Sequence, residues 1–225
     1  SGEGYNQSRE GRTAVDLSQM RTRVRQDLHD EDATSYRWTN AELDRHIQHA
    51  VRELSLAVSQ EAKATLTTTA GSRDLSLASL TGMVSVEAVE YPVNKYPPVY
   101  VAFSLWGSTL TLLVEDTPNG GESVYVYYGK LHTLDATSST IPSPLEDLVA
   151  IGAGGYAALE WSSFATNRVN VGGIEVWQQY QSWGDERLDS FLKGLANHSH
   201  RNRVRAQHLY TAAQPRPSQT TDWGL

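Results

Sequence analysis

The stretch Arg37-Trp38-Thr39-Asn40-Ala41-Glu42-Leu43 opens the best-defined element of the chain. Thr39 and Glu42 have the spacing of a capping box, in which the Thr39 hydroxyl accepts an amide hydrogen bond and Glu42 reaches back to the Thr39 amide. Trp38, just before the cap, is placed to pack onto Leu43. Apolar residues then recur with a period near 3.6: Leu43, Ile47, Ala50, Val51, Leu54 and Val58. The pattern predicts an amphipathic helix.

Upstream of this helix, a second apolar stripe begins behind Asp16. Leu17, Met20, Val24 and Leu28 have helical spacing, and aspartate is a favourable N-cap. We therefore expect a first helix over about residues 17–29. Residues 1–15 are rich in Gly, Ser, Glu and Arg, and we expect them to be a disordered N-terminal extension.

Downstream, the apolar period changes from 3.6 to two near residue 63, which is typical of strands. Turn signals follow at Trp106-Gly107-Ser108 and at residues 118–121, Pro-Asn-Gly-Gly. We interpret residues 62–135 as an antiparallel β module. The alternating residues are Ala64, Leu66, Thr68, Leu75, Leu77, Val84, Val86, Ala88, Val99, Val101, Phe103, Leu105, Leu110, Leu112, Val114, Val124, Val126 and Tyr128.

Two further helices are predicted after the module. Ser143 and Glu146 have capping-box spacing, with Pro144 in the first turn, and Gly172-Gly173 breaks the third helix from the fourth. The expected buried residues are Leu145, Leu148, Val149, Tyr156, Leu159 and Phe164, then Ile174, Trp177, Tyr180, Leu188, Phe191, Leu192 and Leu195. The glycines of residues 152–155 lie inside a helical stripe, so they indicate close helix packing rather than a phosphate-binding turn.

The predicted fold class is therefore α+β. Residues 16–61 supply helices 1 and 2 of a four-helix bundle, and residues 136–197 supply helices 3 and 4. The antiparallel β module is inserted between helices 2 and 3. Residues 198–225 are expected to form an extended basic C-terminal helix or arm, which has little apolar surface to bury by itself.

Composition limits the possible functions. Hydrophobic residues make up 39% and charged residues 20%, and 19 basic against 26 acidic residues give a formal net charge of -7. That balance argues against gripping phosphate backbones over the whole surface. The chain has no cysteine, which excludes disulfides and thiolate zinc sites. The longest apolar run, residues 148–159, has 12 residues, short of the roughly 20 that span a bilayer, so no membrane association is expected.

No catalytic, cofactor or metal site is predicted. His46 and His49 have a spacing that suits a metal, but no third ligand completes the pattern, so we expect both to be solvent-facing polar residues. The carboxylate pairs at residues 31–32 and 146–147 lie near helix ends, where acids are common. His198, His200 and His208 lie in the basic tail and could bind metal only fortuitously. We therefore expect no enzyme activity and no cofactor.

Aromatic residues crowd the β module: Tyr91, Tyr96, Tyr100, Trp106, Tyr125, Tyr127 and Tyr128. They could form a platform for sugar or single-stranded nucleic acid. The favoured alternative is that both faces of the module are covered, one by its own core and one by the helices or by a neighbouring subunit. The tail around Arg201 and Arg205 could touch DNA, but docking onto an acidic protein partner is favoured because the chain itself is acidic.

The capped helix, continued by Ile47, Ala50 and Glu53-Leu54, resembles the head-tail adaptor (connector) proteins of tailed bacteriophages. Their second helix often opens with an aromatic residue, Ser or Thr, Asp and a Glu-Leu step; here Asn40 stands in place of Asp. The order of elements, with an Asn167-Arg168 break between the last helices, is similar to the adaptors or gatekeepers of short-tailed phages. The resemblance spans residues 17–210.

This resemblance implies a structural virion protein at the head-tail junction, assembled in the host cytoplasm. It implies a ring of twelve copies under the portal, a tail or next neck protein at the opposite end, and double-stranded DNA passing through without specific binding. Besides the helix-2 motif of Trp38, Thr39, Glu42 and Leu43, it assigns portal contacts to Arg201, Arg203, Val204, Arg205, His208, Leu209 and Tyr210. Two alternatives stay open: a carbohydrate-binding or other accessory tail protein, and a hydrolase with an unrecognised site.

Overall fold

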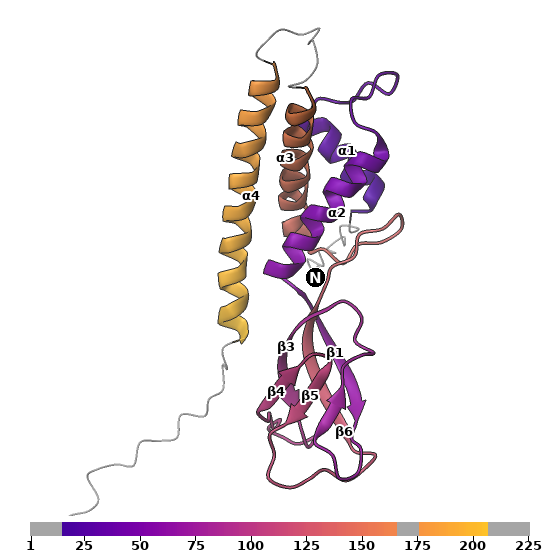
Figure 1. The fold of residues 1–225 in the computed structure, drawn as a ribbon, viewed down its shortest axis with the longest axis vertical. Coiled ribbons are helices and arrows are strands. Elements are labelled where there is room, and N and C mark those ends of the chain that lie inside the picture. Colours follow the sequence, from indigo (N-terminus) through magenta and orange to yellow (C-terminus); the bar gives the residue numbers. More distant parts are fainter. Residues whose placement is uncertain (1–14, 166–175, 207–225) are drawn as a thin grey trace, which may run out of the picture.

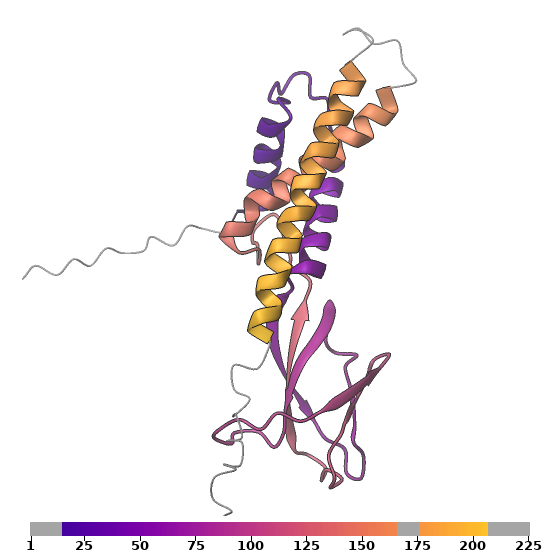
Figure 2. The same ribbon diagram turned by 90° about the vertical axis from the view of Figure 1, so that its left-hand side faces the viewer.

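The computed structural model describes residues 15–165 and 176–206. Within these residues the chain is α+β, with four α-helices and two small antiparallel sheets. Figures 1 and 2 show the helices at one end of the molecule and the sheets at the other. The helices are α1 (Leu17–Asp27), α2 (Asn40–Ala57), α3 (Glu146–Ala165) and α4 (Val176–Ala206), with a 3-10 turn, η1 (Ser143–Leu145), before α3.

The first two helices begin at the predicted caps. The Asp16 side chain accepts the Gln19 amide at 2.8 Å, and the Gln19 side chain accepts the Asp16 amide. At α2, Glu42 accepts the Thr39 amide at 2.7 Å, and the Thr39 hydroxyl accepts the Glu42 amide at 3.3 Å. Both caps satisfy amides that no helical carbonyl can reach, so both predicted starts are confirmed.

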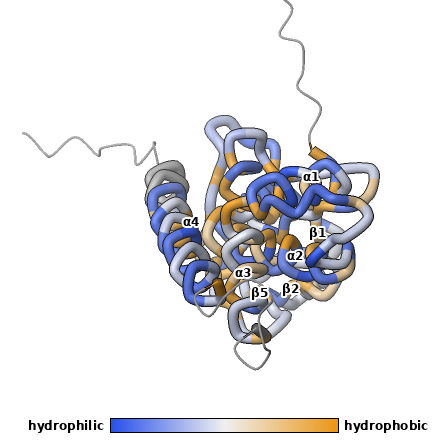
Figure 3. Tube along the Cα trace, turned by 90° about the horizontal axis from the view of Figure 1, so that it is seen from above, coloured by the Kyte–Doolittle hydropathy of each residue, from blue (hydrophilic) through white to orange (hydrophobic). Residues whose placement is uncertain are grey.

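All four helices contribute to one apolar core. Its fully buried side chains include Met20 of α1, Ile47 of α2, Val149 of α3 and Phe191 of α4. Viewed from above, the hydrophobic parts of α2 and α3 lie between the more hydrophilic α1 and α4 (Figure 3). Among the described helices, none is both long enough and apolar enough to cross a membrane.

Helices α3 and α4 approach closely at glycines, as the sequence predicts. A Cβ built on Gly155 would lie 2.9 Å from the Leu188 side chain and 3.2 Å from the Gly184 carbonyl oxygen. One on Gly152 would lie 2.9 Å from the Phe191 ring. A side chain at either glycine would therefore require Leu188 or Phe191 to move, so the two glycines favour this close spacing of α3 and α4.

The expected second capping box is wrong. η1 begins after Pro142 without a side-chain cap, and Glu146 is buried instead, where it accepts the Val15 amide at 3.1 Å and pairs with Arg23 at 3.2 Å. The long-range pairing with α1 competes with the local cap and replaces it. Phe164 and Leu192 are also more than half exposed, contrary to prediction, whereas Ile174 lies outside the described residues.

The strands form two sheets with a core of their own. One sheet has the order β1-β6-β3 and the other the order β2-β5-β4. The predicted turn at Trp106-Gly107-Ser108 is a two-residue hairpin, and Gly107 has a φ of +57°, which glycine adopts without strain. The strands are β1 (Gln60–Thr67), β2 (Asp74–Ser76), β3 (Met83–Glu90), β4 (Phe103–Trp106), β5 (Thr109–Leu112) and β6 (Ser123–Lys130).

Strand β3 departs from the predicted alternation. Its pairing with β6 shifts register between Met83 and Ser85 and again between Val86 and Ala88. Each irregularity reverses which side chains face inward, so Met83, Val86 and Val89 contact the sheet core while Val84 and Ala88 do not. The predicted alternation, which groups Val84, Val86 and Ala88 on one face, is therefore wrong for Val84 and Ala88.

His132, just after β6, is hydrogen-bonded to the end of α2. Its backbone amide donates to the Ser55 hydroxyl at 2.9 Å, and its Nε2 lies 3.0 Å from the Val58 carbonyl oxygen. Nδ1 lies 2.9 Å from the Thr140 carbonyl oxygen and 3.2 Å from its hydroxyl. Burial is the largest influence on the ring and lowers the pKa of His132. These hydrogen bonds hold the segment after β6 against α2, where the helices meet the sheets.

Candidate interaction surfaces

The helix-2 motif is not an exposed contact surface: two of its residues are buried, and the other two form the N-cap of α2. Trp38 and Leu43 are buried, and the Trp38 indole donates to the Ala157 carbonyl at 3.2 Å. Thr39 and Glu42 are occupied by the cap, which lowers the pKa of Glu42 through hydrogen bonds with Thr39. The motif therefore orients α2 against α3.

A buried ion pair supports this motif, and sequence reasoning missed it. Arg25 and Asp30 are both below a tenth exposed and lie 2.5 Å apart. Arg25 also donates to the Trp38 carbonyl and to the Asn40 side-chain oxygen, each at 2.9 Å. Asp30 accepts the Arg37 amide at 2.7 Å. Asn40 thus has a definite role, to accept from Arg25, and only its contact in space reveals it.

The predicted portal-binding residues lie at or beyond the end of α4. Arg201, Arg203, Val204 and Arg205 fall within the last turns of the helix, whereas His208, Leu209 and Tyr210 lie outside the described residues. Gly194 lies opposite Leu148, close to the start of α3. At 1.5 Å per residue, α4 therefore continues about 18 Å beyond this point, and Figure 1 shows its end projecting past α3 toward the sheets.

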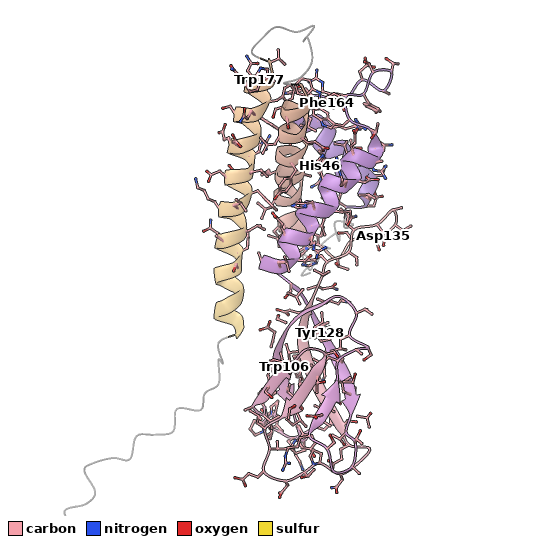
Figure 4. All side chains as sticks on the ribbon, viewed as in Figure 1. His46, Trp106, Tyr128, Asp135, Phe164 and Trp177 are labelled. Atoms are coloured by element: carbon pink, nitrogen blue, oxygen red, sulfur yellow. The ribbon has the colours of Figure 1, made fainter. Side chains whose placement is uncertain are left out.

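His46 does not face solvent as predicted. It is buried where α2 faces α3 (Figure 4), and its Nε2 lies 2.5 Å from Glu160 without hydrogen-bond geometry. Burial is the largest influence and lowers the pKa of His46, although the neighbouring Glu160 acts to raise it. His49 is half-exposed and stacks edge-on against Tyr156. Among the described residues, no cluster of His, Asp or Glu could hold a metal ion.

The aromatic residues of the β module differ in their surroundings. The Tyr91 hydroxyl donates to Glu122, and this hydrogen bond raises the pKa of Tyr91 to about 12. The Tyr127 hydroxyl donates to Glu90, and burial raises the pKa of Tyr127 to about 12. Tyr96 is 99% exposed and Trp106 is 89% exposed. Among the described residues, the helices lie at the other end of the molecule and do not cover the sheets (Figures 2 and 4). Of the two predicted covers, the neighbouring subunit stays a prediction.

The solved structures that resemble this chain include three neck or virion chains of low similarity. Chains described as "Neck of empty GTA particle computed with C6 symmetry" and "Neck of native GTA particle computed with C12 symmetry" are each 15% identical, with a TM-score of 0.28. Each match covers 76% of this chain, and 88% and 91% of the other chain. "Virion of native gene transfer agent (GTA) particle" is 16% identical, with a TM-score of 0.27 and coverages of 75% and 88%. TM-scores this low establish neither a shared fold nor a shared assembly.

No curated protein matches the sequence. The family model for the SU10 adaptor protein, in contrast, matches residues 15–206. That range contains all four helices, both sheets, the helix-2 motif and the basic end of α4. The chain therefore belongs to the SU10 adaptor family of phage head-tail adaptors and is a structural protein of the virion neck.

Proposed function

We propose that twelve copies of this chain form a ring beneath the portal, join the capsid to the tail and line part of the DNA channel. Family membership over residues 15–206 is the observation that carries this proposal. The copy number and the place under the portal follow from the resemblance to head-tail adaptors. The ring assembles in the host cytoplasm and becomes part of the virion at the head-tail junction.

The basic end of α4 is the proposed portal contact. Residues 198–225 contain four arginines and one aspartate in a chain that is acidic overall. α4 continues past the start of α3, so its last turns can reach a neighbouring protein. An isolated helix end gains little stability by itself, and packing against a partner supplies what is missing. Arg201, Arg203 and Arg205 would pair with carboxylates of the portal.

The remaining parts fit the same assignment. We propose that α1–α4 form a four-helix bundle with the six strands as an inserted module, which is supported by two separate apolar cores. The module would face adjacent copies, because it lies at the end of the molecule toward which α4 projects, the proposed portal side (Figure 1). A net charge of -7 favours DNA passage over DNA binding, since each neutralised phosphate adds affinity that would slow transport.

The test is mass measurement of the purified protein, alone and mixed with its portal protein. We expect a weakly associating monomer alone and a multi-copy complex on the portal. Removing all residues after His198 should abolish that complex, whereas removing only those after Tyr210 should preserve it. Full-strength portal binding by the shorter protein would show that the end of α4 is not the contact.

A further inference from the structure

Exposed apolar side chains are concentrated in one part of the β module. Among the described residues, six of the ten large hydrophobic side chains that are exposed lie between residues 96 and 113. Concentrated apolar exposure usually marks an interaction surface. The six are Tyr96, Val99, Tyr100, Leu105, Trp106 and Leu113.

Strand β4, within this segment, is an open sheet edge. β4 pairs only with β5, and Leu113 donates its amide to the Ala102 carbonyl at 2.9 Å. Ala102 and Leu113 are therefore a hydrogen-bonded pair, and such pairs alternate along an antiparallel ladder. Phe103 and Leu105 consequently belong to the non-hydrogen-bonded pairs with β5. Their N–H and C=O groups point away from β5. Soluble proteins protect such edges with charges, prolines or bulges, and residues 103–106 of β4, Phe-Ser-Leu-Trp, have none of these.

Strand β2 is the open edge on the other side of the same sheet. Leu77 donates to the Ser108 carbonyl at 2.8 Å, and Leu112 donates to the Arg73 carbonyl at 2.9 Å. These bonds lie on the outer sides of the Asp74–Thr111 and Ser76–Thr109 pairs, so both pairs are of the non-hydrogen-bonded kind. The Asp74 carbonyl and the Ser76 amide consequently point away from β5. Each chain thus offers two different open edges, β4 and β2, which is what a head-to-tail ring requires.

We propose that β4 of one copy pairs with β2 of the next copy, so that the small sheet continues around the ring. This inference rests on the proposed ring. β2 and β4 are both antiparallel to β5 and therefore parallel to each other. The rotation between neighbouring copies of a twelve-membered ring is small and changes that direction little, so the pairing between copies is parallel.

The free groups and their exposure set the register: Phe103 and Leu105 both have outward-pointing groups, and we place Leu105, the exposed one of the two, opposite Leu75 of the next copy. In a parallel ladder, one residue donates to the carbonyl before its opposite residue and accepts from the amide after it. Leu105 therefore donates to the Asp74 carbonyl and accepts the Ser76 amide of the next copy. Leu105, 43% exposed in one chain, then lies beside Leu75 of the next copy. Ser104 lies opposite Asp74, and Trp106 lies opposite Ser76.

Engineered cysteines test this register, because the chain has no cysteine of its own. Ser104→Cys and Asp74→Cys proteins, mixed with the portal and oxidised, should give a disulfide-linked dimer of one chain of each kind. The two positions within one chain lie on either side of β5, about 9–10 Å apart, too far for a disulfide. Ser104→Cys mixed with Thr65→Cys, an exposed position on β1, should give none. Dimers of Ser104→Cys alone would overturn the proposal in favour of β4 pairing with itself.

Leu105→Pro provides the second test. The Leu105 amide points away from β5, so the substitution removes the bond between copies and keeps those within the sheet. We expect Leu105→Pro to have a native circular dichroism spectrum and to place fewer copies on the portal. Added to the Ser104→Cys and Asp74→Cys proteins, it should prevent their cross-link. Leu105→Val is the control and should change none of these. A full complement of copies on the portal for Leu105→Pro would refute the edge pairing and leave the proposed function intact. If the wild-type protein fails to bind the portal, the proposed function fails, and cross-linking in concentrated adaptor alone still decides the pairing.

Discussion

Replacing Arg25 with methionine should destabilise the protein far more than removing an exposed ion pair. The substitution keeps the apolar volume of the side chain but leaves Asp30 as a buried charge without its cation. Breaking a buried pair in this way costs about 3–5 kcal/mol. Asp30 keeps the amide donors of Arg37 and Trp38, which places the expected loss near the lower limit.

Further losses raise the total. Arg25 lies 3.6 Å above the Tyr36 ring, a contact that contributes about 0.5–1 kcal/mol at an exposed ring. We therefore expect Arg25→Met to lose about 4 kcal/mol. For a protein of this size, each kcal/mol lowers Tm by roughly 2–4 °C, so Tm should fall by roughly 8–16 °C.

Equilibrium unfolding in urea, followed by tryptophan fluorescence, measures this difference. Arg45→Met is the matched control, because the Arg45–Glu160 pair is about half exposed and should contribute at most about 1 kcal/mol. Adding Asp30→Asn to Arg25→Met should restore part of the stability, since no buried charge then remains. If Arg25→Met costs no more than Arg45→Met, the buried pair does not organise the start of α2.

Three other outcomes are expected. Gly155→Val should lose about 2–3 kcal/mol on urea unfolding, because its Cβ alone would meet Leu188 at 2.9 Å; wild-type stability would mean that α3 and α4 can separate without cost. Burial lowers the pKa of His132 in the folded protein. The stability that neutral His132 contributes is therefore complete above about pH 6.5, its pKa in the unfolded chain, and is lost as the pH falls through the folded pKa. His132→Gln should therefore flatten the dependence of unfolding free energy on pH below about 7, and an unchanged slope would contradict this. Glu146→Gln should weaken its pairing with Arg23 and speed hydrogen exchange at the Val15 amide, and unaltered exchange would show that the neutral side chain holds this amide equally well.

The sequence predicts the helix starts at Asp16 and Thr39 because a capping box is local. All partners of such a cap lie within four residues, so spacing alone identifies it. The same rule fails at Glu146, whose partners, Val15 and Arg23, lie more than 120 residues earlier in the chain. Nothing in the local pattern distinguishes a glutamate that caps its own helix from one that is buried against another.

Strand prediction fails for a related reason. Alternation gives the correct inward residues on β6, where Val124 and Val126 are buried. On β3 the two register shifts replace Val84 and Ala88 by Val89, and a bulge depends on the partner strand as well as on its own sequence. The open edges of β2 and β4 are likewise a property of strand order, which hydrophobic periodicity does not contain.

The two proposed contacts use separate parts of the protein and should behave independently. The end of α4 continues from the helical core, whereas β4 and β2 border the sheet core, and the two cores share no residue. Substitutions at distant sites without common partners have additive effects. Truncation after His198 should therefore abolish portal binding while Ser104→Cys and Asp74→Cys still cross-link in concentrated adaptor. Leu105→Pro should instead lose the cross-link and lower the number of copies on the portal without abolishing binding. Loss of both properties from either change would mean that one contact organises the other.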